Sequence, residues 1–445
     1  MKIKILRDPV HGYVSLTEKD LKFIDSLSFQ RLRRIKQSGC HTVYPSANHT
    51  RFEHSIGVMH LGTRVFETIL RKLPSEALDS ISPHLNLLRN TVRYACLLHD
   101  VGHTPLSHTG EFLFDKKLLQ DKLLKITGLS LEQGAPHEYL SCIVALEIFG
   151  TQLDSIGFDK ELFCRMITGN LYKGKIDALS KFKNGIIEIL NSSIDVDKLD
   201  YFSRDSFTSG TSNTLVSIDT ERLISAYNII GGTLCFDSSA LSVVANFVYA
   251  RNTLYMWVYN HHVTIYTDNL VQTFLKSLIE QFPQLGEKFF SIGAILDRHV
   301  DDYDIMKLFK TMRNISPLHS CLYNQLYGRQ YYKALWKNQF QLRELFSKED
   351  AQLEQFKETD PQVIENRLRS ELALKNDFDL FVFRANYKFK KPKVFLNLGG
   401  TTRDFANIYQ QNIYSSLIDT IPMVYANPNL DIEWVRNKTK SLFIT

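Results

Sequence analysis

The sequence predicts a mainly helical protein with a smaller α+β segment at its C-terminal end. Apolar residues recur at helical spacing in long stretches of the first 340 residues, for example from Phe52 to Ile69. Near the C-terminus the pattern changes to the short apolar runs FDLFVF, KVFLNL and MVYA, separated by Lys, Gly and Pro, which is typical of strands. At 445 residues the chain can bury a large core.

Helices are expected in the following order. Thr17 and Asp20 form a capping-box pattern that opens a first helix. The segment SFQRLRRIKQSG is expected to stay helical until Gly39 ends it. Further helices are expected at 52–73, 85–99, 137–149, 160–169 and 195–204, with a loop-rich stretch at 101–136 and one long helix from Ser239 through Tyr259 toward Phe282.

Two domains are expected, residues 1–340 and residues 341–445. The charged stretch SKEDAQLEQFKETD fits a boundary between 340 and 375, although the same stretch could equally be a solvated helix. No internal repeat or low-complexity tract is evident.

Composition favours a soluble, cytoplasmic protein. Hydrophobic residues make up 44% and charged residues 23%, and no apolar run of about 18 residues predicts a membrane span. The opening MKIKILRDP is too quickly polar for a secretory signal, and the six scattered cysteines form no CxxC pair. The formal charge of +5 does not by itself argue for nucleic acid, which is an allowed partner but not a required one.

Histidines and carboxylates concentrate in four segments, RFEHSIGVMH at 51–60, LLHDVGHTPLSH at 97–108, APHE at 135–138 and IDVDKLDYFSRD at 194–205. His99 and Asp100 follow the apolar run YACLL, where a buried carboxylate is costly unless it is paired or bound to a cation. Mixed imidazole and carboxylate ligation suits iron, manganese, zinc or nickel, and magnesium less well. We therefore expect a divalent metal ion, which could polarise a phosphoryl oxygen and activate a water.

The order H…HD…D, formed by His54, His99, Asp100 and Asp197, resembles the HD-domain phosphohydrolase superfamily. The surrounding motifs DPVHGYV, FQRLRRIKQSG, RFEHSIGV, HDVGHTPLSH and DVDKLDYFSRD are similar to the deoxynucleoside triphosphate triphosphohydrolases. This similarity covers roughly residues 4–335 and is strongest from 8 to 205. It implies a helical HD-domain fold and a metal held by those four residues.

The resemblance also implies catalytic roles for His103, His108, His137 and Glu111. His108 is the candidate general acid toward the sugar 5′ oxygen, oriented by His137 or Glu111. Glu111 stands where the family has an aspartate, and each imidazole could instead be only a hydrogen-bonding neighbour of the site.

A deoxynucleoside triphosphate is the implied substrate. The implied substrate-binding residues are Gln37, Arg51, Lys198, Tyr201, Asp205, Arg251 and Tyr259. The three cations among them would contact the triphosphate, and each could otherwise be a surface or helix-pairing charge. Gln37 and Asp205 would hold the sugar 3′ hydroxyl, Tyr201 would exclude a 2′ hydroxyl, and Tyr259 would lie near the sugar and base unless it is a core residue.

The family further implies nucleotide activation and a homo-oligomer, either a dimer or a tetramer. Residues that resemble its allosteric nucleotide contacts are Lys4, Asp25, Arg33, Arg222, Arg329 and Lys333. These residues could equally be surface charges, and LCFDSS at 234–239 lacks two basic residues that the family has there.

Three functional hypotheses remain. The leading one is metal-dependent hydrolysis of a dNTP to the deoxynucleoside and inorganic triphosphate, by water attack at the α-phosphate. The second is an HD phosphodiesterase that acts on cyclic nucleotides or oligonucleotides. The third is a nucleotide-sensing, nucleic-acid-binding scaffold, against which the intact set of metal ligands argues.

Overall fold

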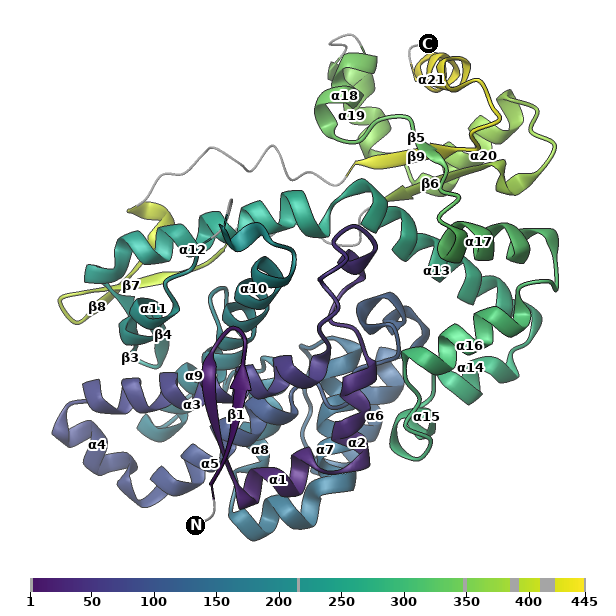
Figure 1. Ribbon diagram of the computed structural model, residues 1–445. Helices are drawn as coiled ribbons and strands as arrows, with labels where there is room; N and C mark the ends of the chain where they lie inside the picture. The colour runs from purple at the N-terminus through teal and green to yellow at the C-terminus, as the bar shows by residue number, and fades with distance from the viewer. Residues whose placement is uncertain (1–2, 214–216, 347–349, 385–391, 409–420, 444–445) are drawn as a thin grey trace.

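The structure is a computed structural model that describes residues 3–213, 217–346, 350–384, 392–408 and 421–443. Helices dominate these residues, as the sequence predicts, and the strands form three small sheets (Figure 1). The helices are α1 (Glu18–Ile24), α2 (Leu27–Gln30), α3 (Arg51–Lys72), α4 (Ser75–Ile81), α5 (Leu85–Leu98), α6 (Lys116–Thr127), α7 (Pro136–Ile156), α8 (Lys160–Thr168), α9 (Ala178–Leu190), α10 (Val196–Thr208), α11 (Thr220–Ala226), α12 (Leu241–Leu254), α13 (His262–Gln281), α14 (Gln284–Phe289), α15 (Ile292–Leu296), α16 (Asp302–Met312), α17 (Pro317–Gly328), α18 (Gln339–Leu345), α19 (Asp350–Glu358), α20 (Pro361–Glu371) and α21 (Ile432–Ser441).

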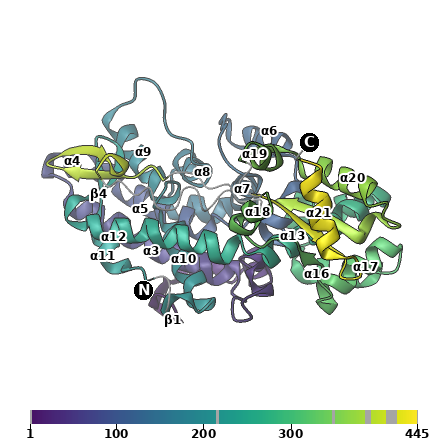
Figure 2. The same ribbon diagram turned by 90° about the horizontal axis from the view of Figure 1, so that it is seen from above.

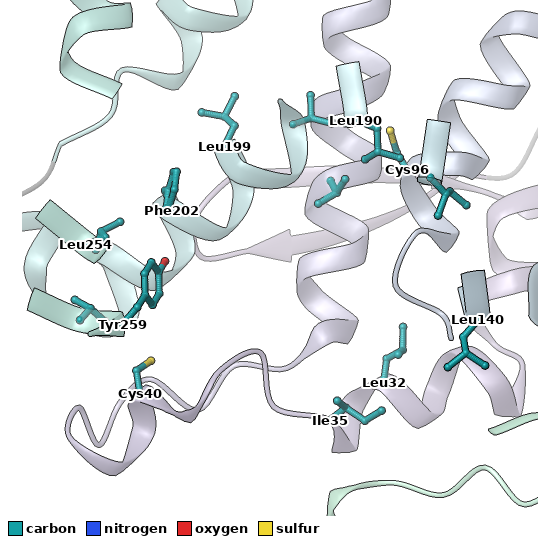
Figure 3. Close-up of a cluster of buried hydrophobic side chains, with 14 of the residues drawn as sticks. Leu32, Ile35, Cys40, Cys96, Leu140, Leu190, Leu199, Phe202, Leu254 and Tyr259 are labelled. Atoms are coloured by element: carbon teal, nitrogen blue, oxygen red, sulfur yellow. The ribbon is translucent and has the colours of Figure 1, made fainter. Parts of the chain in front are cut away.

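The core of the N-terminal part is a helical bundle. Helix α3 packs along α5 and against α10, while α7 and α8 pack on each other and on α5. The capping box predicted at Thr17 opens α1, because the Thr17 side chain accepts from the Asp20 backbone and the Asp20 carboxylate accepts from the Thr17 backbone. Figure 3 shows buried apolar side chains that belong to the segment 32–40 and to α5, α7, α9, α10 and α12.

The loop-rich stretch expected at 101–136 is wrong in its middle, where α6 forms. Asp115 caps this helix by accepting from two backbone amides, and Gly128 ends it in a left-handed conformation. Leu119 and Leu123, one helical turn apart, are buried. Helix α9 was also not among the expected elements.

The helix expected as far as Gly39 is wrong beyond the 3-10 turn Arg31–Arg34. The following backbone pairs with the segment before α3 instead, because the Arg51 amide donates to the Ile35 carbonyl at 3.0 Å and the Gln37 amide donates to the His49 carbonyl at 3.2 Å. This pairing brings Gln37 next to Arg51.

The single helix expected after Ser239 is interrupted. Helix α12 ends at Leu254, a π-helical turn follows at Tyr255–Tyr259, and α13 begins only at His262. Figures 1 and 2 show α12 and α13 running across the N-terminal helices. Tyr255 and Tyr259, which lie four residues apart at the two ends of this turn, both line the same cavity.

The strands are β1 (Ile3–Asp8), β2 (Gly12–Thr17), β3 (Tyr227–Ile230), β4 (Thr233–Asp237), β5 (Lys333–Ala334), β6 (Leu380–Arg384), β7 (Phe395–Leu398), β8 (Thr401–Asp404) and β9 (Pro422–Ala426). Strands β1 and β2 form an antiparallel hairpin with Asp8 opposite Gly12. The second sheet has the order β3-β4-β7-β8, in which β4 and β7 are parallel, and the third has the order β5-β9-β6. The strands predicted in FDLFVF, KVFLNL and MVYA are confirmed as β6, β7 and β9.

Both of these sheets combine strands from the two sides of residue 340. Strand β7 extends the sheet begun by β3 and β4, whereas β5 joins β9 and β6. The division into domains 1–340 and 341–445 therefore stays a prediction.

Among the described helices, α7 is long and apolar enough to cross a membrane by length and composition alone. Half of its apolar window is buried inside the protein, and the helix packs against α5, α6, α8 and α15. Core helices of soluble proteins can have the same length and apolar composition.

Candidate metal centre and substrate cavity

Three helices bring the four predicted metal ligands together. His54 lies in the first turn of α3, His99 and Asp100 follow the last turn of α5, and Asp197 lies in the first turn of α10. The His54 Nε2 atom is 3.0 Å from Asp197 Oδ1 and 3.6 Å from Asp100 Oδ2. The His99 Nε2 atom is 3.6 Å from each of the same two oxygens.

These separations fit a single metal ion. Ligand atoms at about 2.1 Å from one ion and about 90–110° apart are separated by roughly 3.0–3.5 Å. The Nε2 atoms of His54 and His99 are buried and have no hydrogen-bond partner among the described residues. Both Nδ1 atoms are bonded, His99 to the Cys96 carbonyl at 2.9 Å and His54 to Asp200 Oδ2 at 2.7 Å, so Nε2 is the atom left for a metal.

Charge in this cluster also favours a cation. Burial lowers the pKa of His54, but the neighbouring carboxylates of Asp197 and Asp200 outweigh burial and raise the pKa to about 10. Burial raises the pKa of Asp100, but Arg51 and the neighbouring imidazoles outweigh it and hold that pKa far below its usual value. A divalent ion would displace the proton of His54, so metal affinity should rise with pH.

A second cluster contains the predicted catalytic residues. Glu111 Oε1 accepts from His137 Nδ1 at 2.8 Å, and Glu111 Oε2 accepts from His108 Nδ1 at 3.1 Å. His103 is fully buried and stacks on His137 with ring centroids 4.5 Å apart, and neither of its ring nitrogens has a hydrogen-bond partner among the described residues. Glu111 reaches both imidazoles despite standing where the family has an aspartate.

The three imidazoles differ in charge. Burial lowers the pKa of His137, but Glu111 outweighs burial and raises that pKa to about 9. Burial lowers the pKa of His108 and brings the pKa of His103 well below its usual value. At neutral pH the cluster therefore holds one imidazolium, paired with Glu111, beside two neutral rings.

Both clusters face a cavity of about 300 Å³, which is large enough for a small ligand. Of the predicted residues, those that line it are Gln37, Arg51, His99, Asp100, His108, His137, Asp197, Lys198, Tyr201, Asp205 and Tyr259. His54, His103 and Glu111 lie behind this lining, and Arg251, whose guanidinium lies over the Tyr255 ring, is not part of it.

Hydrogen bonds and close polar contacts fix further residues around the cavity. The Tyr259 hydroxyl donates to Asp205 Oδ2 at 2.5 Å, and His49 Nε2 lies 2.7 Å from Asp205 Oδ1. The Lys198 ammonium donates to Asp195 at 2.7 Å, and Arg51 donates to Asp100 and Ser107. Asp197, Tyr201 and Asp205 share one face of α10, as their spacing predicts.

Several residues near the site were not assigned a role from the sequence. Tyr255 lines the cavity four residues before Tyr259, so their common segment RNTLYMWVYNHH carried a signal for it. His49 and Asp200 meet predicted residues only through contacts between segments far apart in the sequence, and no local pattern indicates those contacts.

The six residues predicted as allosteric contacts are all exposed. Arg33 bonds to the Gln30 side chain, and its guanidinium lies 3.5 Å from the centre of the Phe52 ring. Arg329 donates to the Thr42 carbonyl at 2.8 Å, and Arg222 donates to the Ser239 carbonyl at 3.3 Å. Their role in nucleotide binding stays a prediction.

Comparison with known families identifies the class of this protein. Residues 51–205 match the HD domain, and residues 218–366 match the HD associated region. All four predicted metal ligands lie within the first match. The chain therefore contains an HD domain followed by an HD associated region.

Individual proteins from other organisms are also similar to this chain. An uncharacterised protein of Methanocaldococcus jannaschii is 30% identical over 315 residues, which are 70% of this chain and 56% of the relative. The deoxynucleoside triphosphate triphosphohydrolase SAMHD1 homolog of Dictyostelium discoideum is 32% identical over 262 residues, 58% of this chain and 46% of that protein. The chain thus spans about half the length of these curated relatives.

The fold as a whole has a counterpart among crystal structures. A hypothetical protein from Aquifex aeolicus superposes with a TM-score of 0.69 at 23% identity, and the match covers 98% of this chain and 100% of the other. At this identity the likeness shows the fold alone, and it includes the C-terminal part that lies beyond the two family matches.

Proposed function

We propose that this chain is a metal-dependent dNTP triphosphohydrolase, which cleaves its substrate to the deoxynucleoside and inorganic triphosphate. One observation carries the proposal: a single cavity places the metal cluster beside the imidazole cluster and faces both with Tyr201, Asp205 and Tyr259. A phosphate ester, its leaving oxygen and a sugar would each meet a suitable group there. The activity for which the Dictyostelium relative is named agrees with this proposal.

The metal would polarise the α-phosphoryl group and lower the pKa of an attacking water. Lys198 and Arg51 would hold the phosphate oxygens, because both cations line the cavity beside the metal cluster. His108 would protonate the 5′ oxygen as it leaves, with Glu111 fixing the orientation of its ring. Burial lowers the pKa of His108, so the ring gives up a proton readily once substrate phosphates have favoured its charged form.

Sugar recognition would fall to Gln37, Tyr201 and Asp205, which also line the cavity. The Gln37 Oε1 atom is buried and has no hydrogen-bond partner among the described residues, which leaves it to accept from a 3′ hydroxyl. The Asp205 carboxylate, held by Tyr259, would accept from the same hydroxyl. We propose that Tyr201 packs against the ribose and leaves no room for a 2′ hydroxyl.

Incubation of the purified chain with dNTPs and NTPs, singly and in mixtures, with manganese or magnesium, tests the proposal. Chromatography should detect inorganic triphosphate and a deoxynucleoside. Pyrophosphate, a monophosphate or no product in any mixture would refute the proposal, and cleavage of a cyclic nucleotide or an oligonucleotide instead would support an HD phosphodiesterase. The mixtures test whether a second nucleotide activates the chain, and we also propose that the chain forms a homo-oligomer, either a dimer or a tetramer.

Asp197→Ala removes one metal ligand and should abolish turnover. Asp154→Ala, at an exposed position on α7, is the matched control and should keep full activity. Metal content and circular dichroism of both variants would separate loss of the metal from loss of the fold. Full turnover in Asp197→Ala would contradict the metal assignment.

A further inference from the structure

A network of buried charges lies behind the metal ligand His54. It consists of Asp8, His11, Asp200 and Arg204, hereafter the Asp200 network. Asp200 Oδ2 accepts from His54 Nδ1 at 2.7 Å, and Asp200 Oδ1 accepts from His11 Nε2 at 2.5 Å. The Arg204 guanidinium donates to the two Asp200 oxygens at 2.9 and 2.8 Å and to Asp8 Oδ2 at 2.9 Å.

These contacts tie the N-terminal hairpin to the helix that carries Asp197. Asp8 Oδ1 accepts from the backbone amides of Val10 and His11 at 2.8 and 2.9 Å, which closes the turn between β1 and β2. Asp200 and Arg204 lie one turn apart on α10. The hairpin turn is therefore fixed to α10 at two points, by Arg204 through Asp8 and by Asp200 through His11.

The network members are almost completely shielded from water. Their side chains are between 0% and 4% exposed, and each charge is matched by an opposite charge within hydrogen-bond distance. None of the four lines the cavity, so they cannot contact a substrate there. A buried ion network costs desolvation free energy and adds little stability by itself, which points to a role in positioning.

The two metal-binding imidazoles are held in different ways. His99 bonds to the carbonyl of Cys96, three residues earlier in the same helix, so α5 alone orients it. His54 bonds to a carboxylate 146 residues away. Its orientation therefore depends on whether Asp200 stays in place, and Asp200 is held on one side by Arg204 and on the other by His11.

We propose that Asp8, His11 and Arg204 are positioning residues of the metal centre. They hold Asp200 so that it fixes the ring of His54 with Nε2 directed at the ion, and the turn between β1 and β2 thereby becomes part of the metal site. This inference rests on the metal binding in the proposed function, but not on the identity of the substrate. Loss of such a supporting contact typically weakens metal binding 10–100-fold.

The test measures the manganese affinity of the metal-free chain, residues 1–445, by competition with a fluorescent chelator and without nucleotide. His11→Ala should raise the Kd for Mn²⁺ about 10–100-fold. His11→Gln, whose amide can still donate to Asp200, should restore part of the affinity. His60→Ala is the matched control, because His60 is a nearby half-buried histidine on α3 that belongs to neither the metal cluster nor the Asp200 network.

A second readout separates positioning from structural support. Mn²⁺ should raise the thermal midpoint of His11→Ala less than that of the wild type, because the stabilisation by a ligand depends on its Kd. A merely structural role would lower the midpoint equally with and without Mn²⁺. Asp8→Asn, which keeps the shape of the side chain, replaces His11→Ala if that variant does not fold.

An unchanged Kd in a folded His11→Ala or Asp8→Asn variant overturns the inference. If that result accompanies normal dNTP hydrolysis by the wild type, the proposed function stands and the positioning role falls. If the variants lose Mn²⁺ affinity while the wild type hydrolyses no dNTP, the positioning role stands and the substrate assignment falls.

Discussion

Gly57 lies on α3 directly against the Asp200 network, and its replacement by alanine makes the sharpest stability prediction. A Cβ atom at this position would lie 1.9 Å from Asp200 Oδ1 and 2.6 Å from Arg204 Nη2. Both distances are far below van der Waals contact, so the carboxylate or the guanidinium must move. In a helix, Gly→Ala otherwise stabilises by about 1 kcal/mol.

The expected magnitude follows from the balance of these two effects. Breaking a buried ion pair costs about 3–5 kcal/mol, because the displaced charge has no water to replace its partner. Subtracting the helix-propensity gain of about 1 kcal/mol leaves Gly57→Ala destabilised by roughly 2–4 kcal/mol. Since Asp200 also holds His54, the variant should bind Mn²⁺ more weakly as well.

Urea denaturation followed by circular dichroism measures the effect on stability. Gly150→Ala is the matched control, because Gly150 lies in α7 and nothing stands within 4 Å of its added Cβ. That control should be as stable as the wild type, or more stable by up to about 1 kcal/mol. If Gly57→Ala behaves like Gly150→Ala, the reasoning about the Asp200 network is refuted.

Three further predictions concern the site. Glu111 raises the pKa of His137 to about 9, above the value of about 6.5 expected in the unfolded chain. The ion pair of Glu111 and His137 therefore contributes its full stabilising free energy below pH 6.5 and loses it as the pH rises toward 9. Thermal midpoints across that range should fall in the wild type and fall less steeply in Glu111→Gln, and equal slopes would contradict the pairing. Tyr259→Phe removes the hydroxyl that donates to Asp205, and a bond to a charged acceptor contributes about 1.5–3 kcal/mol, so KM for a dNTP should rise about 10–100-fold with a smaller change in kcat. An unchanged KM would remove Asp205 from sugar binding. Chelation of the metal should lower the thermal midpoint of the wild type and leave that of Asp197→Ala unchanged, and an equal drop in both would place the ion elsewhere.

The clustering of the candidate metal ligands could be predicted from sequence because these residues stand in short motifs. His99 and Asp100 are adjacent at the end of an apolar helix, and α10 keeps Asp197, Tyr201 and Asp205 on one face. Helical periodicity alone is sufficient to bring the last three together.

The supporting contacts could not be predicted in the same way. His11 and Asp200 are separated by 189 residues, and Asp8 and Arg204 by 196, so their pairing exists only once the hairpin has docked on α10. Arg251 is a different case, because its guanidinium lies over the Tyr255 ring and the residue is not among those that line the cavity. Helix α6, by contrast, carried local signals at Asp115 and Gly128 that do predict a helix.

The parallel pairing of β4 with β7 has a consequence for any shortened form of the protein. Phe236 and Asp237 in β4 pair with Leu396 and Asn397, so β4 is an inner strand only while the C-terminal segment is present. A chain that ends at residue 340 would turn β4 into an open edge with unpaired backbone amides and carbonyls, and it would strip β5 of its only partner strand among the described residues. Open strand edges pair with strands of other molecules, so such a fragment should self-associate through β4. By covering the edge of β4, the C-terminal segment would protect the protein from this kind of aggregation.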